Sequence, residues 1–167
     1  MFSVRRFVLA ALITASAIAL FASAAPARVQ SLVPQQSLRG LKIGMVASQV
    51  RAVAGKPSSN KIVSHPLLGK TRRMRFGKVD VTFRGTSATA PVVNLTTTSR
   101  NERTSSGIGV GSSEKQLTTK LVGERCVTEL GYRHCYLGKR SPGFVVTDFS
   151  ISKGGRVTQV TLGLVID

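Results

Sequence analysis

The chain has 167 residues, of which 24 are Lys or Arg and 7 are Asp or Glu, so its formal net charge is +17. The acidic residues are scattered and form no pair suited to acid–base cleavage of a glycosidic bond. The sequence also contains no low-complexity segment and no dedicated nucleic-acid-binding motif. These features favour a strongly basic globular protein and argue against a carboxylate-based hydrolase.

The N-terminus predicts a secretory signal peptide over residues 1–24. Arg5 and Arg6 precede an apolar stretch, 7–22, and Ala22-Ser23-Ala24 fits a small-x-small cleavage site, with Ala25-Pro26-Ala27 as a second candidate. The alternative is a permanent membrane anchor, but the stretch is shorter than the roughly 20 residues that span a bilayer. We therefore expect a secreted or extracytoplasmic protein with no transmembrane segment after cleavage. Because no Cys lies near the cleavage region, we do not expect a lipoprotein.

An internal similarity organises the rest of the chain. Leu41-Lys42-Ile43-Gly44 is followed six residues later by Val50, and Ile108-Gly109-Val110-Gly111 is followed six residues later by Leu117. After an irregular linker over 25–38, the similarity defines two units, 39–104 and 105–167. The predicted fold class is α+β, with two tandem repeats, each a short helical segment packed on an antiparallel β-meander.

In the first unit, apolar spacing predicts a helix over 47–54 that stops at Gly55. Alternating residues then predict strands over 73–76, 79–84 and 93–96.

In the second unit, Ser113 and Gln116 have the spacing of a helix capping box. Leu117, Leu121 and Val122 form the expected apolar stripe, and Gly123 the expected stop. Strands are predicted over 134–137, 148–151 and 159–161, with a hairpin turn over 152–156.

The two cysteines, Cys126 and Cys135, predict a disulfide, since an even pair in an exported protein is usually oxidised. One alternative joins Cys126, His134 and Cys135 as metal ligands, but three ligands without a fourth make a poor zinc site. A catalytic thiol is the other alternative, although each Cys has a ready oxidation partner. No metal and no cofactor is predicted.

Positive charge is concentrated in the first half. Residues 39–103 carry 13 basic and 2 acidic residues, whereas 104–167 carry 8 basic and 5 acidic ones. Arg73, Arg75 and Arg84 are expected on one solvent-facing side of the sheet, with Lys70 and Arg72 at its edge. His134 and Tyr136 occupy the corresponding face of the second unit. Arginines bind phosphate and carboxylate groups bidentately, although solvated strand residues that deter aggregation would produce the same pattern.

The remaining polar motifs give weaker indications of a functional site. His65 lies beside Pro66 in an expected loop and is interpreted as an exposed bystander, and His134 as a surface or cross-strand packing residue. The run 107–111 is Gly-Ile-Gly-Val-Gly, which suggests a phosphate-binding loop, but it lacks the strand–glycine–helix context and the Lys of such loops. We interpret it as an entry turn.

The order of these motifs resembles two known families. An apolar-x-apolar-Gly start, a short helix ending in Gly-x-Pro and an antiparallel meander are similar to the tandem unit of β-lactamase inhibitor proteins. They are also similar to the single unit of small outer-membrane lipoproteins of the SmpA/OmlA type. The matching residues are Ile43-Gly44-Met45, Val50 and Gly55-Lys56-Pro57, with a weaker echo in Val110-Gly111, Leu117 and Gly123.

The resemblance implies inhibition of an exported enzyme, and the chain departs from it in three ways. Val46 stands where the family has a Thr or Ser helix cap. The chain has no Trp, whereas the inhibitors present a concave sheet rich in aromatics. The lipidated Cys of the lipoproteins is missing, which argues against their role in outer-membrane assembly.

The leading hypothesis is therefore a secreted, non-enzymatic binding module whose basic surface contacts an anionic component of the bacterial envelope or an acidic protein partner. The alternative is a proteinaceous inhibitor of an exported enzyme such as a β-lactamase. An enzyme would require a compact pocket that holds His134 near a carboxylate such as Asp148.

Overall fold

A computed structural model describes residues 31–166, and the predicted signal peptide lies outside them. The strands of the described part are β1 (Leu32–Val33), β2 (Ser37–Leu38), β3 (Ser59–His65), β4 (Gly69–Phe76), β5 (Val79–Phe83), β6 (Val92–Thr97), β7 (Arg125–Glu129), β8 (Tyr132–Leu137), β9 (Val145–Ile151) and β10 (Val157–Leu164). Its helices are α1 (Ala47–Ala54) and α2 (Glu114–Lys120).

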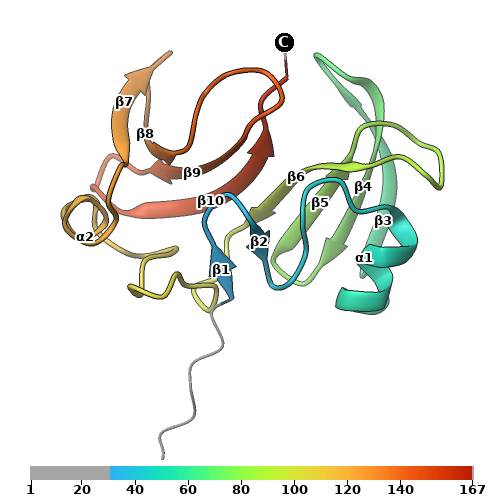
Figure 1. Cartoon of the computed structure of the whole chain (residues 1–167), viewed down its shortest axis with the longest axis horizontal. Coiled ribbons are helices and arrows are strands. Elements are labelled where there is room, and N and C mark those ends of the chain that lie inside the picture. Colours follow the sequence, from blue (N-terminus) through green and yellow to red (C-terminus); the bar gives the residue numbers. More distant parts are fainter. Residues whose placement is uncertain (1–30, 167) are drawn as a thin grey trace, which may run out of the picture.

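Eight strands form one antiparallel sheet in the order β3-β4-β5-β6-β10-β9-β8-β7. The junction at its centre pairs β6 with β10, from Thr97 opposite Val160 to Asn94 opposite Gly163. The sheet curves, so that β7 and β8 rise on one side and β3 and β4 on the other (Figure 1). The small β1–β2 pair lies in front of its centre (Figure 1).

This architecture corrects the predicted fold class. The described chain is mostly antiparallel β-structure with one continuous sheet, and not two tandem α+β repeats. The physical reason is the β6–β10 pairing, which removes an exposed edge from each predicted meander. The helices, of eight and seven residues, are too short to cover a four-stranded meander each.

The core is a single cluster that spans both halves of the sheet. It includes Met74 and Val81 from one half and Phe149 and Leu162 from the other, all fully buried. Leucines from the segment before α1 complete it, namely Leu32, Leu38 and Leu41. Residues 31–38, the described part of the predicted linker, therefore contribute two short strands and two core leucines.

The helices begin and end for different local reasons. Helix α1 has the predicted bounds and ends at Gly55, whose φ of 79° suits glycine. Helix α2 has the predicted capping box, since the Ser113 hydroxyl accepts from the Gln116 amide at 3.1 Å and the Gln116 side chain accepts from the Ser113 amide at 2.9 Å. Val122 does not belong to the apolar stripe, because α2 ends at Lys120 and the Val122 side chain is 95% exposed.

The predicted strands correspond to β4, β5, β6, β8, β9 and β10, although β5 ends one residue before the predicted Arg84, and the predicted turn at 152–156 joins β9 to β10. Sequence patterns missed β3 and β7, which are the two edge strands of the sheet. Within residues 31–166, no helix is long and apolar enough to cross a membrane.

Candidate functional site

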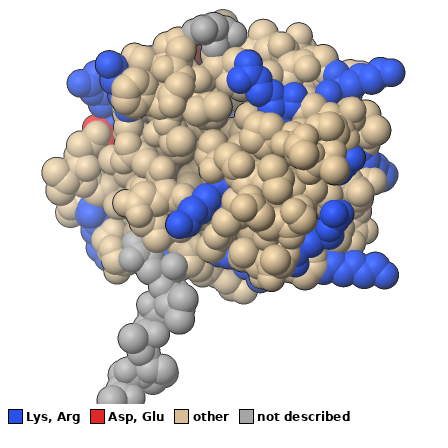
Figure 2. Space-filling model, turned by 45° about the vertical axis from the view of Figure 1, so that its right-hand side comes forward, with Lys and Arg blue, Asp and Glu red and all other residues tan. Residues whose placement is uncertain are grey.

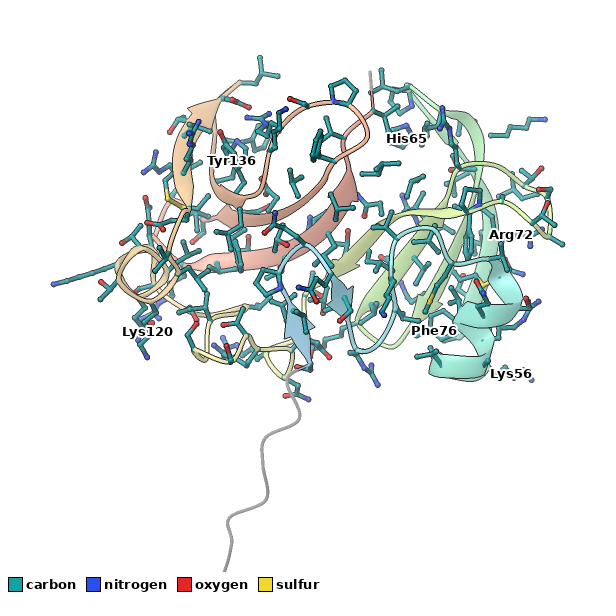
Figure 3. All side chains as sticks on the ribbon, viewed as in Figure 1. Lys56, His65, Arg72, Phe76, Lys120 and Tyr136 are labelled. Carbon is teal, nitrogen blue, oxygen red and sulfur yellow. A yellow bond between two sulfur atoms is a disulfide. The ribbon has the colours of Figure 1, made fainter. Side chains whose placement is uncertain are left out.

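One face of the sheet is lined by a continuous row of polar and charged side chains. The pairing registers place one residue from each of the eight strands in this row. In spatial order they are Ser59, Arg75, Asp80, Thr96, Thr161, Asp148, Tyr136 and Arg125. We call this side of the sheet the polar face; its other side carries the core. Tyr136 and His65 lie at opposite ends of the upper part of the molecule, and Phe76 lies on the lower side (Figure 3).

A cavity of about 450 Å³ lies over the β4–β5–β6–β10 part of the polar face. The side chains along its floor carry a guanidinium, a carboxylate, hydroxyls and amides, from Arg73, Asp80, Thr82, Asn94, Thr96 and Gln159. Aliphatic residues of the β3–β4 turn and of the C-terminal segment form its walls, namely Leu67, Leu68, Leu164 and Ile166. The cavity therefore combines one guanidinium and one carboxylate with neutral hydrogen-bonding groups and apolar walls.

Two arginines on β4 face this side with different electrostatic roles. Arg75 binds Asp80 bidentately, with Nε–Oδ1 and Nη2–Oδ2 distances of 2.7 and 2.9 Å. That hydrogen bond raises the pKa of Arg75. Arg73 is exposed and has no carboxylate partner within residues 31–166. The uncompensated charge of the cavity therefore belongs to Arg73, which lies opposite Lys61 on β3 and Thr82 on β5.

The remaining predicted basic residues do not join Arg73. Arg72 alternates with it along β4, and its guanidinium donates to the carbonyl of Thr86. Lys70 is exposed near the start of β4, and Arg84 is exposed just beyond the end of β5. Neither lines the cavity. The structure thus places Arg73 and Arg75 on the same face of β4, whereas Lys70, Arg72 and Arg84 do not line the cavity.

His65 was predicted to be an exposed loop residue, but it is the last residue of β3, is half-buried and lines the cavity. Its Nδ1 accepts a hydrogen bond from the Leu67 amide at 3.2 Å. This contact ties the imidazole to the β3–β4 turn and orients the aliphatic wall beside it.

His134 and Tyr136 lie at the other end of the polar face, in a cluster of charged groups. Nδ1 of His134 contacts the Asp148 carboxylate, and Nε2 lies 3.5 Å from Oε2 of Glu129. Arg140 binds Glu129 with distances of 2.7 and 2.9 Å, and its guanidinium carbon lies 5.1 Å from the centre of the Tyr136 ring. The hydrogen bond from Arg140 lowers the pKa of Glu129.

The contact named above as a condition for an enzyme is present, because Nδ1 of His134 contacts the Asp148 carboxylate. The other ring nitrogen faces the Glu129 carboxylate. His134 is not among the residues that line the cavity over the polar face. The contacts join β7, β8, β9 and the segment after β8, and so cross-link this end of the sheet.

The predicted disulfide between Cys126 and Cys135 is confirmed. It links directly paired residues of β7 and β8, and Cys135 is fully buried in the core. The metal alternative fails on geometry, because His134 alternates with Cys135 along β8 and so faces the other side of the sheet. Glu114 lies close to both sulfurs, but these are bonded to each other and Glu114 is held by Arg133.

The glycine-rich run at 107–111 is closed by its own contacts. The Arg103 guanidinium donates to the carbonyls of Gly107 and Val110 and to the Ser112 hydroxyl, at 2.9–3.1 Å. The amides of Ile108, Gly109 and Gly111 already donate to Thr104, Ser112 and Val157. These amides are therefore not available to hold a phosphate, and the run is an entry turn organised by Arg103.

Across the described residues, most carboxylates are already paired. Of 21 basic residues in 31–166, four bind carboxylates, namely Arg39, Arg75, Arg133 and Arg140, which leaves 17 without such a partner. Figure 2 shows Lys and Arg in separate groups over the visible face, with little acidic surface between them. The outward field is therefore positive and spread over the molecule.

The chain matches no protein-family model, no curated protein and no solved structure at a significant level.

Proposed function

We propose that this protein is an extracytoplasmic, non-enzymatic binding module that holds an anionic polymer of the cell envelope on its polar face. The observation that carries the proposal is the exposed Arg73 guanidinium in the cavity, which has no carboxylate partner among the described residues. The neighbouring Arg75 is neutralised by Asp80, so one charge dominates the floor of the cavity.

The chemistry around Arg73 favours an acidic saccharide as the ligand unit. A guanidinium binds a carboxylate through two parallel hydrogen bonds. The hydroxyl and amide groups of Thr82, Asn94 and Gln159 match sugar hydroxyls. Leu164 and Ile166 provide an apolar wall for the C–H face of a sugar ring. One ligand unit therefore matches the Arg73 guanidinium, the neutral polar groups and the apolar wall, while the Asp80 carboxylate is already bound by Arg75.

The charge of the whole molecule supports a polymeric ligand. The unpaired basic residues attract a polyanion over long range and raise its association rate. This contribution is screened by salt, because the Debye length falls from about 10 Å at 0.1 M to about 3 Å at 1 M ionic strength. Specific contacts at Arg73 would then set where the polymer is held.

The test compares Arg73→Gln with wild type in binding to polygalacturonate at about 0.1 M and 1 M salt, by calorimetry. Loss of a charge-assisted hydrogen-bonding group is expected to weaken binding by about tenfold or more at low salt. Lys153→Gln removes the same charge from the β9–β10 turn and is expected to change affinity by less than about twofold. Equal losses in both variants, or binding that salt does not weaken, would contradict the proposal.

A protein inhibitor of an exported enzyme is the second candidate, and a specific observation favours it. Large apolar side chains are exposed at the turns of two hairpins, with Leu67 at 74% in one and Leu130 and Tyr132 at 98% and 77% in the other. Exposed apolar groups of this kind anchor protein interfaces. Titration of β-lactamases and other exported hydrolases tests it, and no inhibition at micromolar protein would remove it.

A further inference from the structure

A second hollow, away from the polar-face cavity, gathers three basic side chains from distant parts of the sequence. It has a volume of about 640 Å³. Arg39 comes from the segment after β2, Lys78 from the β4–β5 turn and Arg100 from the segment after β6. We call this hollow the triple-cation pocket. Its residues do not include any that line the cavity around Arg73.

The charges of the triple-cation pocket are not balanced from within. Its one carboxylate, Glu102, is buried and accepts a hydrogen bond from the Thr97 hydroxyl at 3.0 Å. Its nearest cation is Arg39, with Nε 3.9 Å from the carboxylate. Lys78 and Arg100 have no carboxylate partner within residues 31–166. Like charges that share one hollow repel each other, and a bound anion would offset that repulsion.

The backbone around the pocket is held in a defined shape. Arg39 has a φ of 52°, a left-handed conformation that non-glycine residues rarely adopt. With Gly40, whose φ is 77°, it forms the two-residue turn between Leu38 and Leu41, which exchange two backbone hydrogen bonds of 2.9 Å. Its amide also donates to the Ser31 carbonyl at 2.6 Å. The position of Arg39 is therefore specified rather than incidental.

Arg100 is also held from both sides. Its carbonyl accepts from Nε of Arg103 at 3.0 Å. Its side chain lies along Gly111, where a β-carbon would come within 3.6 Å of the Arg100 Nε. The floor between Arg100 and β6 is fixed by the Ser99 amide, which donates to the Thr97 hydroxyl at 3.0 Å, and by the Asn101 amide, which donates to the Ser99 hydroxyl at 3.1 Å.

We propose that the triple-cation pocket binds a multivalent oxyanion of the phosphate class. A tetrahedral oxyanion offers several acceptor oxygens, so it can accept from two guanidinium groups and an ammonium at once. The hydroxyl groups of Ser99 and Ser31 and the side-chain amide of Asn101 lie in the same lining and suit the remaining oxygens. The same chemistry is offered by a free anion and by a phosphomonoester lipid headgroup, as in phosphatidic acid.

The experiment measures binding of inorganic pyrophosphate by calorimetry at fixed ionic strength, with wild type, Lys78→Gln and Arg100→Gln. Wild type is expected to bind one equivalent saturably, and each variant is expected to bind about tenfold more weakly or worse. Lys153→Gln carries the same change in net charge and is expected to keep wild-type affinity to within about twofold. Non-saturable binding, or equal weakening in Lys153→Gln, would overturn the proposal.

Two further experiments complete the test. One identifies the source of the phosphate, and the other separates this proposal from the proposed function of the polar face. Sedimentation with phosphatidic acid vesicles distinguishes the ligands: loss in both pocket variants assigns the site to a lipid headgroup, and loss with pyrophosphate alone assigns it to a free anion. Arg73→Gln is expected to bind pyrophosphate as wild type does. If Arg73→Gln weakens pyrophosphate binding as much as the pocket variants do, the pocket is not a separate site.

Discussion

At the residue scale, the Arg103 guanidinium is bound by backbone carbonyls and the Ser112 hydroxyl, and not by a carboxylate. This guanidinium and the adjacent bridge to Gly109 draw the segment 100–112 into a compact loop. The approach is close enough that a β-carbon on Gly109 would lie 2.3 Å from the Glu102 carbonyl oxygen. Gly109 is therefore required for steric reasons, and not for contact with a phosphate.

We expect Gly109→Ala to lower the free energy of unfolding by roughly 1–3 kcal/mol, because the backbone must shift to admit the methyl group. Chemical denaturation measures this. Gly154→Ala is the matched control, since its β-carbon would meet Ser152 at an ordinary 3.8 Å, and we expect it to change stability by less than about 0.5 kcal/mol. Equal effects of the two substitutions would show that steric approach at Gly109 is not the cause.

The contact between Arg140 and Glu129 gives a prediction on pH. The pKa of Glu129 is lowered in the folded protein, first by its hydrogen bond to Arg140. The contact therefore adds stability above the pKa of Glu129 in the unfolded chain, and this contribution is lost as the pH falls through the folded value. The sensitive range lies below the ordinary glutamate pKa of 4.5.

We expect Arg140→Gln to raise the Glu129 titration midpoint toward its ordinary value, as followed by NMR of the side-chain carboxyl carbon. Arg133→Gln is the control, because Arg133 holds Glu114 instead. A Glu129 midpoint that is the same in wild type and Arg140→Gln would rule out Arg140 as the cause of the shift.

At the element scale, the disulfide anchors β7, which is an edge strand with one neighbour. Replacing Cys126 and Cys135 together by Ala removes a link that closes a nine-residue separation. The chain-entropy estimate for such a loop is a loss of about 2.5 kcal/mol. Hydrogen exchange is expected to accelerate first in β7 and the β7–β8 turn. Uniform acceleration over the whole sheet would contradict a local anchoring role.

The elements that could be predicted are those whose pattern is local. Helix α1 follows from its apolar spacing and Gly55, and β5 from the strict alternation of Val79, Val81 and Phe83. The strand β3 was missed because most of its residues face solvent, so that the sequence shows no alternation. Because β3 was not predicted, the position of Lys61 opposite Arg73 was not predicted either.

The candidate site could be predicted only in part. Alternation along β4 placed Arg73 and Arg75 on one face, and the structure keeps them there. Which of the two is neutralised depends on the register with β5, which puts Asp80 opposite Arg75. That His65 and the C-terminal segment wall the same cavity depends on the curvature of the sheet, for which local sequence has no signal.

At the scale of the whole molecule, the β6–β10 junction sets both the fold and the site. It joins two four-stranded halves into one sheet, which places Thr96 beside Thr161 with their hydroxyl oxygens 3.3 Å apart. The polar row therefore crosses the centre without a break, and Gln159 of β10 reaches the cavity that Arg73 of β4 lines. Tertiary pairing, and not either half alone, creates the proposed binding surface.

The most direct test of this account is an amide NMR titration of the wild-type protein with oligogalacturonate. We expect saturable shift changes on β4, β5, β6 and β10 around Arg73, Thr82 and Asn94, with little change at Lys120 and Lys153. Shift changes of similar size at Lys120 and Lys153, or none around Arg73, would contradict binding at the polar face.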